Sequence, residues 1–119
     1  MVVWDPEEDA WVTRVRQPAF KILLGGSGRP DPQLVAHARD IVSSPDKLDT
    51  SVRLLLVSAA NDLPTASSEI LGLRIESVAL MWPDHPDDGM VFLDGPNTEG
   101  RVWRCDYVGR QPQGLGFDD

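Results

Sequence analysis

Hydrophobic and polar side chains alternate along several short segments of this chain, which is typical of β-strands that bury one face. Three of these segments lie in the C-terminal half, at residues 73–82, 90–94 and 101–108, and loops rich in Pro, Gly, Asp and Asn separate them. A further short strand is predicted at 115–117, after a turn over residues 111–114. The pattern therefore predicts three or four consecutive strands in this half.

Three more strands are predicted near the N-terminus. Residues 2–4 and 10–15 flank a loop whose proline and acidic residues suit a hairpin connection. Apolar residues alternate again over residues 20–24, and this strand is expected to end at the glycine-rich segment Gly25–Gly28.

Two helices are predicted between these groups of strands. The Asp31 carboxylate can cap the first helix, and Pro32 suits the first helical position because its missing N–H would have no helical partner there. Apolar residues then recur with helical spacing. Ser44-Pro45 repeats the start signal for a longer helix that ends near residues 61–64, whereas residues 65–71 suit either a helical turn or a loop.

This order predicts an α+β fold: an antiparallel β-sheet of about six strands with two consecutive helices packed on one face, in the order βββ-αα-βββ(β). The length of 119 residues suits a single α+β domain over residues 1–119. The second half of segment 73–82 is apolar at both alternating positions. A homodimer joined through the uncovered face of this strand is therefore one alternative.

Acidic residues outnumber basic ones, and the formal net charge is −8. Residues 84–119 hold eight acids against three arginines, so the C-terminal part is the acidic pole. Such a surface repels phosphate backbones and anionic lipids, so we expect no nucleic acid and no membrane as partners. A basic protein partner suits this charge, although many proteins are acidic only for solubility.

The expected compartment is cytoplasmic. The N-terminal residues have neither the basic region nor the apolar run of a signal or transit peptide, and no apolar run approaches the roughly 20 residues of a membrane helix. The single cysteine, Cys105, cannot form an intramolecular disulfide. Its place in an alternating strand favours an inert thiol in the core.

Gly25–Gly28 lies between a predicted strand and a predicted helix, where a phosphate-binding loop would occur. It lacks the Lys and hydroxyl residue of a nucleotide P-loop, and Ser27 lacks the second glycine of a nucleophile elbow. A cleft beside this loop, with His37 or His85 as its polar element, is the basis of an alternative in which the chain is a small-ligand-binding protein or an enzyme.

Asp84, His85, Asp87 and Asp88 form the most metal-like cluster, but their spacing matches no defined calcium or zinc motif. We therefore expect no metal and no cofactor. Tryptophans are numerous for this length, and each of the four falls in a predicted strand. Core packing is the commoner role at such positions, and a partner-facing aromatic patch is the alternative.

Four segments carry a resemblance to a known group of proteins: Leu71–Val78, Met90–Leu93, Arg101–Gly109 and Gly114–Asp118. Placed after a helical pair, they resemble small bacterial domains of unknown function whose relatives include presumed immunity proteins of toxin systems. The shared closing strand, glycine turn and Gly-Phe-Asp segment are structural, so no active-site residue can be carried over, and the N-terminal hairpin has no match. The resemblance implies an α+β fold, no catalytic activity and neutralisation of a cognate toxin.

We therefore expect a non-enzymatic, cytoplasmic protein-binding domain that is immunity-like and neutralises a basic protein partner, such as a toxin, by occlusion through its acidic loops. Charge complementarity would speed the encounter, and buried aromatic anchors would supply affinity. No catalytic residue is predicted. The predicted partner-binding residues are Trp82, Asp84, Asp87, Asp88, Asp118 and Asp119.

Overall fold

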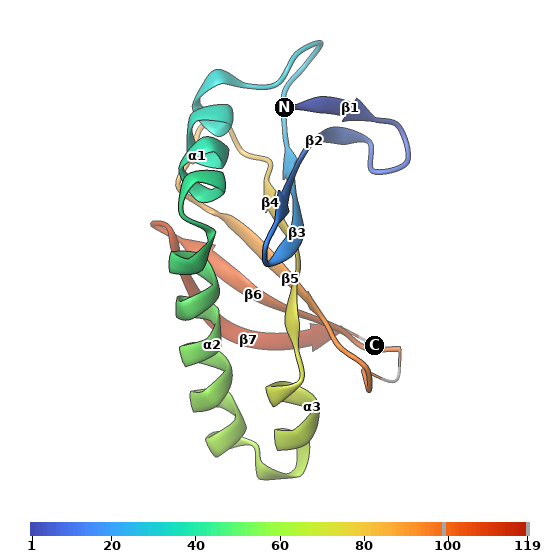
Figure 1. The fold of residues 1–119 in the computed structure, drawn as a ribbon, viewed down its shortest axis with the longest axis vertical. Helices are drawn as coiled ribbons and strands as arrows, with labels where there is room; N and C mark the ends of the chain where they lie inside the picture. The colour runs from blue at the N-terminus through green and yellow to red at the C-terminus, as the bar shows by residue number, and fades with distance from the viewer. Residues whose placement is uncertain (99, 119) are drawn as a thin grey trace.

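The computed structural model describes residues 1–98 and 100–118 of the chain. Within these residues the chain forms one sheet and a set of helices on one side of it (Figure 1). The strands are β1 (Val3–Asp5), β2 (Ala10–Arg16), β3 (Ala19–Leu24), β4 (Arg74–Leu80), β5 (Gly89–Asp94), β6 (Val102–Val108) and β7 (Gln111–Asp118). The helices are α1 (Pro32–Ser43), α2 (Pro45–Asp62), the 3-10 turn η1 (Pro64–Ala66) and α3 (Ser67–Leu71).

The seven strands lie side by side in the order in which they occur in the sequence. All neighbouring strands are antiparallel except β3 and β4, which are parallel. The α+β class and the largely antiparallel sheet are thus confirmed. The described chain differs from the prediction in that the optional seventh strand is present, a third short helix follows the two predicted ones, and one strand pair is parallel. The helical segment between β3 and β4 returns the chain to the other end of the sheet, so β4 must enter parallel to β3.

The helices begin where the sequence predicts. The Asp31 carboxylate accepts hydrogen bonds from the backbone N–H groups of Gln33 at 3.0 Å and Leu34 at 3.2 Å, which caps α1. Only Ser44 separates α1 from α2, and its side chain makes no capping hydrogen bond. Residues 65–71, whose sequence suits either a helical turn or a loop, lie in η1 and α3.

A β-bulge in β4 explains why this strand looks apolar on both sides. Ile75 pairs with Leu93 and Ser77 with Phe92, so Glu76 is an extra residue on the β4 side. The bulge reverses the alternation, because Ile75 before it and Val78 after it are both buried in the same core. The face of β4 away from the helices therefore carries Arg74 and Glu76 up to the bulge and Ala79 beyond it.

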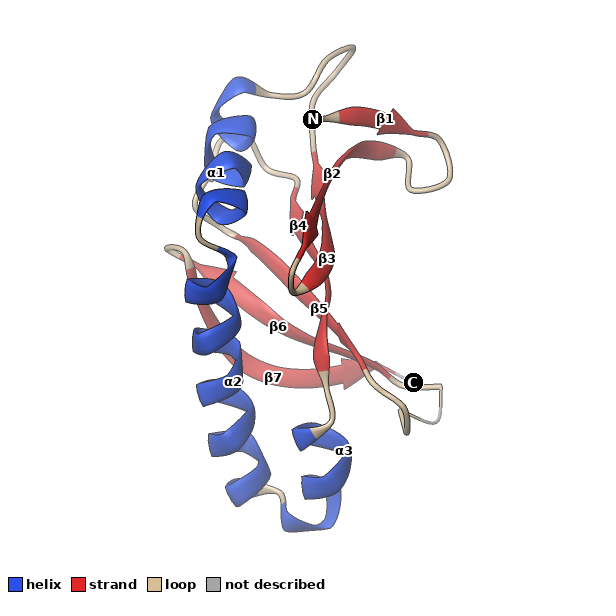
Figure 2. Cartoon of the chain, viewed as in Figure 1, coloured by secondary structure: helices blue, strands red, loops and turns tan. Residues whose placement is uncertain are grey.

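The core lies between the helices and one face of the sheet, as Figure 2 shows by the placement of α1 and α2 along that face. Trp103, Cys105 and Tyr107 of β6 share this face and are buried. From the helices, Leu34, Ile41, Val52 and Leu56 pack against them and against the central strands. Burial of this apolar surface is the main source of stability for a chain of this size.

The other face of the sheet is covered by no helix of the described chain (Figure 2). We call it the open face. Strand register and alternation place apolar residues of β3 to β6 on it, with Met81 just beyond the end of β4: Leu23, Ala79, Met81, Met90, Phe92, Val102 and Val108. Arg104 and Asp106 of β6 lie among them. Met81, Val102 and Val108 are exposed.

Candidate functional site

Residues 82–88, which connect β4 to β5, contain four of the predicted contact residues. The turn at the tip of the β6–β7 hairpin holds this loop in place. The backbone N–H of Arg110 donates to the carbonyl of Asp87 at 2.9 Å, and its guanidinium Nε donates to Asp87 Oδ1 at 2.7 Å. A second guanidinium nitrogen donates to Asp40 Oδ2 of α1 at 2.9 Å. One arginine thus joins the hairpin, the loop and the first helix.

The backbone conformation of the hairpin turn positions Arg110 for these contacts. Gly109 and Arg110 both have positive φ, 58° and 65°, as a two-residue turn with primed geometry requires. Arginine is uncommon in this conformation, which costs about 1 kcal/mol or more. Its ion pairs with Asp40 and Asp87 offset that cost. The guanidinium also holds the pKa of the Asp87 carboxyl below its usual range.

The predicted acids of the loop therefore differ in their roles. Asp87 pairs with Arg110, and Asp88 Oδ1 accepts the backbone N–H of Gly109 at 2.8 Å. Asp84 and Trp82 are exposed. The loop is a structured connection that presents Trp82 and Asp84 to solvent.

Asp118, the predicted C-terminal acid that the structure describes, lies elsewhere. Asp118 pairs with Val102 in the sheet, at the end of β6 opposite to Gly109, so roughly 20 Å of extended strand separates it from the loop. Its carboxylate accepts a hydrogen bond from Arg104 Nε at 2.9 Å, which lowers the pKa of Asp118. Asp119 lies outside the described residues. The five predicted contact residues that the structure describes thus do not form one continuous group.

His37 is fully buried at the boundary between α1 and the sheet. Its Nδ1 lies 2.6 Å from the carbonyl oxygen of Pro86, which can only accept, so Nδ1 carries the proton of the neutral ring. Nε2 therefore accepts the hydroxyl proton of Tyr107, at 3.0 Å, and the two rings stack with centroids 5.6 Å apart. Burial lowers the pKa of His37 and raises that of Tyr107 to about 12.

A pocket of about 410 Å³ opens beside this pair, at the junction of α1, α2 and the β6–β7 hairpin. Polar residues line much of it, including Ser44, Lys47 and Ser51. Both imidazole nitrogens of His37 are already bonded, so in this arrangement the ring holds the 82–88 loop to α1 and has no free nitrogen for proton transfer.

The glycine-rich loop is packed against the end of β4. The N–H of Gly25 donates to the carbonyl of Leu80 at 3.0 Å, and a Cβ on Gly25 would lie 2.7 Å from the Met81 carbonyl oxygen. Gly26 has a φ of +144°, and a Cβ there would meet backbone at 2.1 Å. Close backbone approach therefore explains these two glycines, while Ser27 is exposed.

The remaining reactive side chains give no metal or thiol centre in the part of the chain that is described. Burial raises the pKa of the Cys105 thiol to about 11, so it is protonated at neutral pH. His85 is exposed, with its Nδ1 4.0 Å from Asp88 Oδ2. Among residues 1–98 and 100–118, no three His, Cys, Asp or Glu side chains are grouped closely enough to hold a metal ion.

One end of the open face combines an exposed tryptophan with apolar and acidic neighbours. We call this the Trp82 surface, formed by Trp82, His85, Met90, Asp106 and Val108, which line a hollow of about 290 Å³. The side chains of Trp82 and Val108 are 48% and 46% exposed. Asp84 lies two residues along the same loop. The other tryptophans differ: Trp103 is buried, Trp11 is half-buried, and Trp4 is exposed at the far N-terminal end of the sheet.

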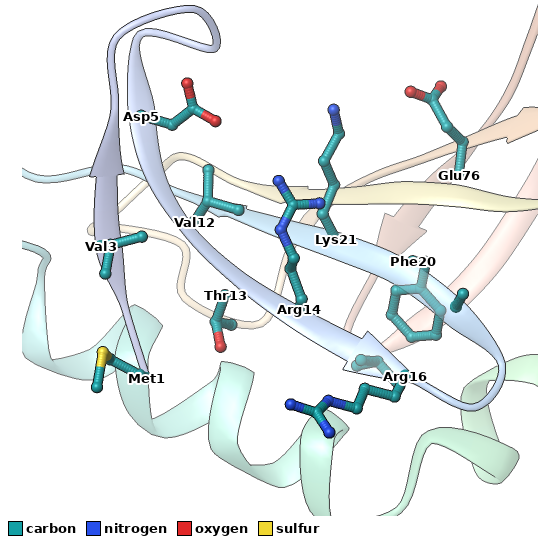
Figure 3. A pocket seen from close by; sticks show the side chains of 12 residues that line it. Met1, Val3, Asp5, Val12, Thr13, Arg14, Arg16, Phe20, Lys21 and Glu76 are labelled. Atoms are coloured by element: carbon teal, nitrogen blue, oxygen red, sulfur yellow. The ribbon is translucent and has the colours of Figure 1, made fainter.

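A larger groove, of about 860 Å³, lies between β1 and β2 (Figure 3). β1 pairs with β2 only over Val3 to Asp5, opposite Val12 to Ala10, and Figure 3 shows β2 bending away from β1 beyond that point. The groove widens where the two strands diverge. Arg14, Lys21 and Glu76 rise from one side of the sheet into it (Figure 3).

No protein-family model matches the chain, and neither a curated protein nor a solved structure matches it. The resemblance to immunity proteins thus stays a prediction. No helix of the described residues is long and apolar enough to cross a membrane.

Neither Arg110 nor the end of β2 that β1 leaves unpaired was predicted from the sequence. A glycine followed by arginine between two alternating strands signals a two-residue hairpin, so the turn could have been found. The contacts of Arg110 with Asp40 and Asp87 could not, because these acids lie 70 and 23 residues away in the chain.

Proposed function

We propose that this chain is a protein-binding domain that works through the open face of its sheet, with the Trp82 surface as the main contact. The observation that carries the proposal is the exposed Trp82 in a hollow with Met90 and Val108, on a face that no described helix covers. Exposed tryptophans surrounded by apolar side chains are frequent anchors of protein interfaces.

The charge around this surface favours a basic partner. Asp106 lines the hollow with Trp82, Asp84 follows Trp82 by two residues in the loop, and the chain is acidic overall. Carboxylates at the rim of an interface accelerate the encounter with a basic partner and reject acidic ones. Arg110 holds the neighbouring Asp87 and Asp88 region in place, so little ordering entropy would be lost on binding.

Occlusion of a basic toxin is the particular activity that we propose for this surface, in line with the predicted resemblance to immunity proteins. An inhibitor of this kind needs no catalytic group, only a rigid surface that covers the site of its target. The structured 82–88 loop and the sheet behind it would supply such a surface.

Site-specific photocrosslinking tests the proposal. A photoreactive amino acid replaces Trp82 in one variant and Leu54 in a control, because Leu54 is 69% exposed on the solvent side of α2. After irradiation of the host cells, we expect a defined crosslinked protein of basic composition from position 82 only. Crosslinks that are identical from both positions, or absent from position 82 alone, would reject the Trp82 surface as the contact.

The proposal that the partner is a toxin is tested by co-expression. Growth would be measured on co-expression with a basic, toxic product of a neighbouring gene. We expect the wild-type chain to restore growth and the variant with Trp82→Ala and Asp84→Ala to fail, while both accumulate to equal levels. Equal protection by both forms would argue against occlusion through this surface.

A small-ligand-binding protein or an enzyme is the second candidate. The pocket beside His37 and Tyr107 favours it over a cleft at Gly25–Gly28, because Lys47 and several serine hydroxyls converge there. Small phosphates and carboxylates would be screened for an increase in melting temperature. We expect any such increase to disappear in Lys47→Ala; a screen without a shift that depends on Lys47 would remove this candidate.

A further inference from the structure

The strand β2 has an unpaired edge beside the groove in Figure 3. Its pairing with β1 ends at Val12, yet the strand continues to Arg16 and stays paired with β3 on its other side. Every second residue from Thr13 to Arg16 therefore directs its N–H and C=O to a side where no strand of the described chain lies. Such a row of backbone groups can accept an additional strand.

The two sides of this edge differ in chemistry. Arg14 and Arg16 are exposed and alternate with Thr13 and Val15, which are buried toward the core. On the side of α1, a hollow of about 340 Å³ lies next to Thr13. Apolar side chains of α1 form much of its wall: Val35, Ala38 and Val42. An added strand would thus meet arginines with one set of alternate side chains and an apolar hollow with the other.

Charge indicates what such a strand would carry. Arg14 and Arg16 make no ion pair with any carboxylate among the described residues, although acids exceed bases in the chain by eight. Lys21, next to Arg14 on β3, is already paired with Glu8. Two unpaired arginines on an acidic protein are a local site for carboxylates.

The same arginines disfavour pairing with a second copy of the chain. In an antiparallel pair of two β2 edges, Arg14 and Arg16 of one copy would lie opposite arginines of the other. Like charges directly across strands are destabilising. Basic residues on an open edge are a common protection against self-association.

We propose that the β2 edge binds an extended acidic peptide segment of a partner protein by strand addition. Alternate Asp or Glu side chains of that segment contact Arg14 and Arg16, and the intervening apolar side chains enter the hollow beside α1. This interaction is separate from the one proposed for the Trp82 surface. The segment bound at the β2 edge is acidic, whereas the partner of the Trp82 surface is basic.

Fluorescence anisotropy with a synthetic peptide tests the proposal. The probe is a capped octapeptide that alternates valine and glutamate, and a peptide of equal composition with its valines and glutamates in two blocks is the sequence control. We expect the alternating peptide to bind at least about tenfold more tightly, because only alternation presents each kind of side chain to its own side. N-methylation of alternate backbone nitrogens should abolish binding, since it removes the ladder hydrogen bonds.

Charge reversal gives the second arm. The variant Arg14→Glu with Arg16→Glu should bind the glutamate peptide about tenfold more weakly, as expected for two exposed ion pairs, and should prefer an alternating valine–lysine peptide. The control Arg29→Glu with Arg53→Glu changes the net charge equally at other sites and should bind nearly as wild type does. Circular dichroism and melting curves establish that both variants fold.

Three results would overturn the proposal: equal binding of alternating and block peptides, equal loss in both charge-reversal variants, or no binding of the alternating peptide up to millimolar concentration. Sedimentation of the wild-type protein, without and with the peptide, tests whether a second copy of the chain occupies the edge. A concentration-dependent dimer that the peptide dissociates would show that the edge is occupied by a second copy, against the proposal.

Discussion

At the residue scale, the most informative side chain is His37. It lies on α1 between Leu34 and Ile41, and its ring is packed in the interior. Its two hydrogen-bond partners, Pro86 and Tyr107, lie 49 and 70 residues away in the chain, so no local pattern could have named them. This ring joins α1 to the 82–88 loop directly, beside the connection that Arg110 makes through Asp40 and Asp87.

The stability of the protein should fall as the pH is lowered through the ordinary histidine pKa of 6.5. Burial lowers the pKa of His37 in the folded chain and outweighs the hydrogen bond to the Pro86 carbonyl, which raises it; Arg110 lowers it further, and Asp87 and Asp40 oppose. The folded state therefore binds fewer protons than the unfolded state below pH 6.5, and acid favours unfolding. The stabilising contribution is complete above that pH and is lost as the pH falls toward the lower pKa of the folded state.

Urea unfolding at about pH 7.5 and about pH 5.5 measures this effect. The control is His37→Gln, which cannot titrate and which should cost about 1–3 kcal/mol at the higher pH because Tyr107 and Pro86 lose a partner. The difference in the free energy of unfolding between wild type and His37→Gln should be smaller at the lower pH. Asp87, Glu69 and Asp118 have lowered pKa values and titrate below this window. If this difference in the free energy of unfolding were the same at both pH values, it would contradict the role given to His37.

At the scale of the elements, local signals predicted the starts of the helices and most strands, but two features depended on pairing. The bulge at Glu76 reverses the alternation of β4, and the sequence shows this only as a strand that is apolar on both sides. The parallel pairing of β3 with β4 follows from the path of the helices across the sheet. Strand order is a tertiary property that alternation does not encode.

The second bulge, between β6 and β7, gives a paired test of backbone conformation. Gly114 has a φ of +56° at the point where the register shifts, whereas Gly116 has no positive φ and open space around it. We expect Gly114→Ala to lower the free energy of unfolding by about 1–2 kcal/mol. Gly116→Ala should leave it unchanged or slightly raised. Equal effects of the two substitutions in urea unfolding would show that the bulge does not require glycine.

The two helix starts form another matched pair. Asp31 accepts two backbone hydrogen bonds, while Ser44 makes none with its side chain. Asp31→Ala should therefore destabilise the protein by about 1 kcal/mol, and Asp31→Asn by less. Ser44→Ala should have little effect. Thermal unfolding of the three variants checks this, and a larger loss from Ser44→Ala than from Asp31→Ala would contradict the assignment of the caps.

At the scale of the whole molecule, the helices cover one face of the sheet and the open face carries apolar side chains with acids at one end. Composition predicted an acidic protein, but it could not predict that Asp87, Asp88 and Asp118 would accept hydrogen bonds from other groups of the chain itself. Asp87 and Asp118 stay exposed but pair with Arg110 and Arg104. Among the described residues, Trp82 and Asp84 are thus the exposed members of the predicted set that make no such pair. The proposed function rests on this exposed pair and its apolar neighbours.

Oxidative footprinting of the tryptophans tests that claim most directly. Trp82 and Trp4 are almost equally exposed, at 48% and 46%, and lie in different parts of the sheet, so each serves as the control for the other. We expect radical labelling of Trp82 to fall at least about threefold in host cells relative to the purified protein, as burial at an interface would produce, while Trp4 stays unchanged. Equal labelling of Trp82 in both settings, or protection of Trp4 in its place, would contradict the assignment of the open face as the working surface.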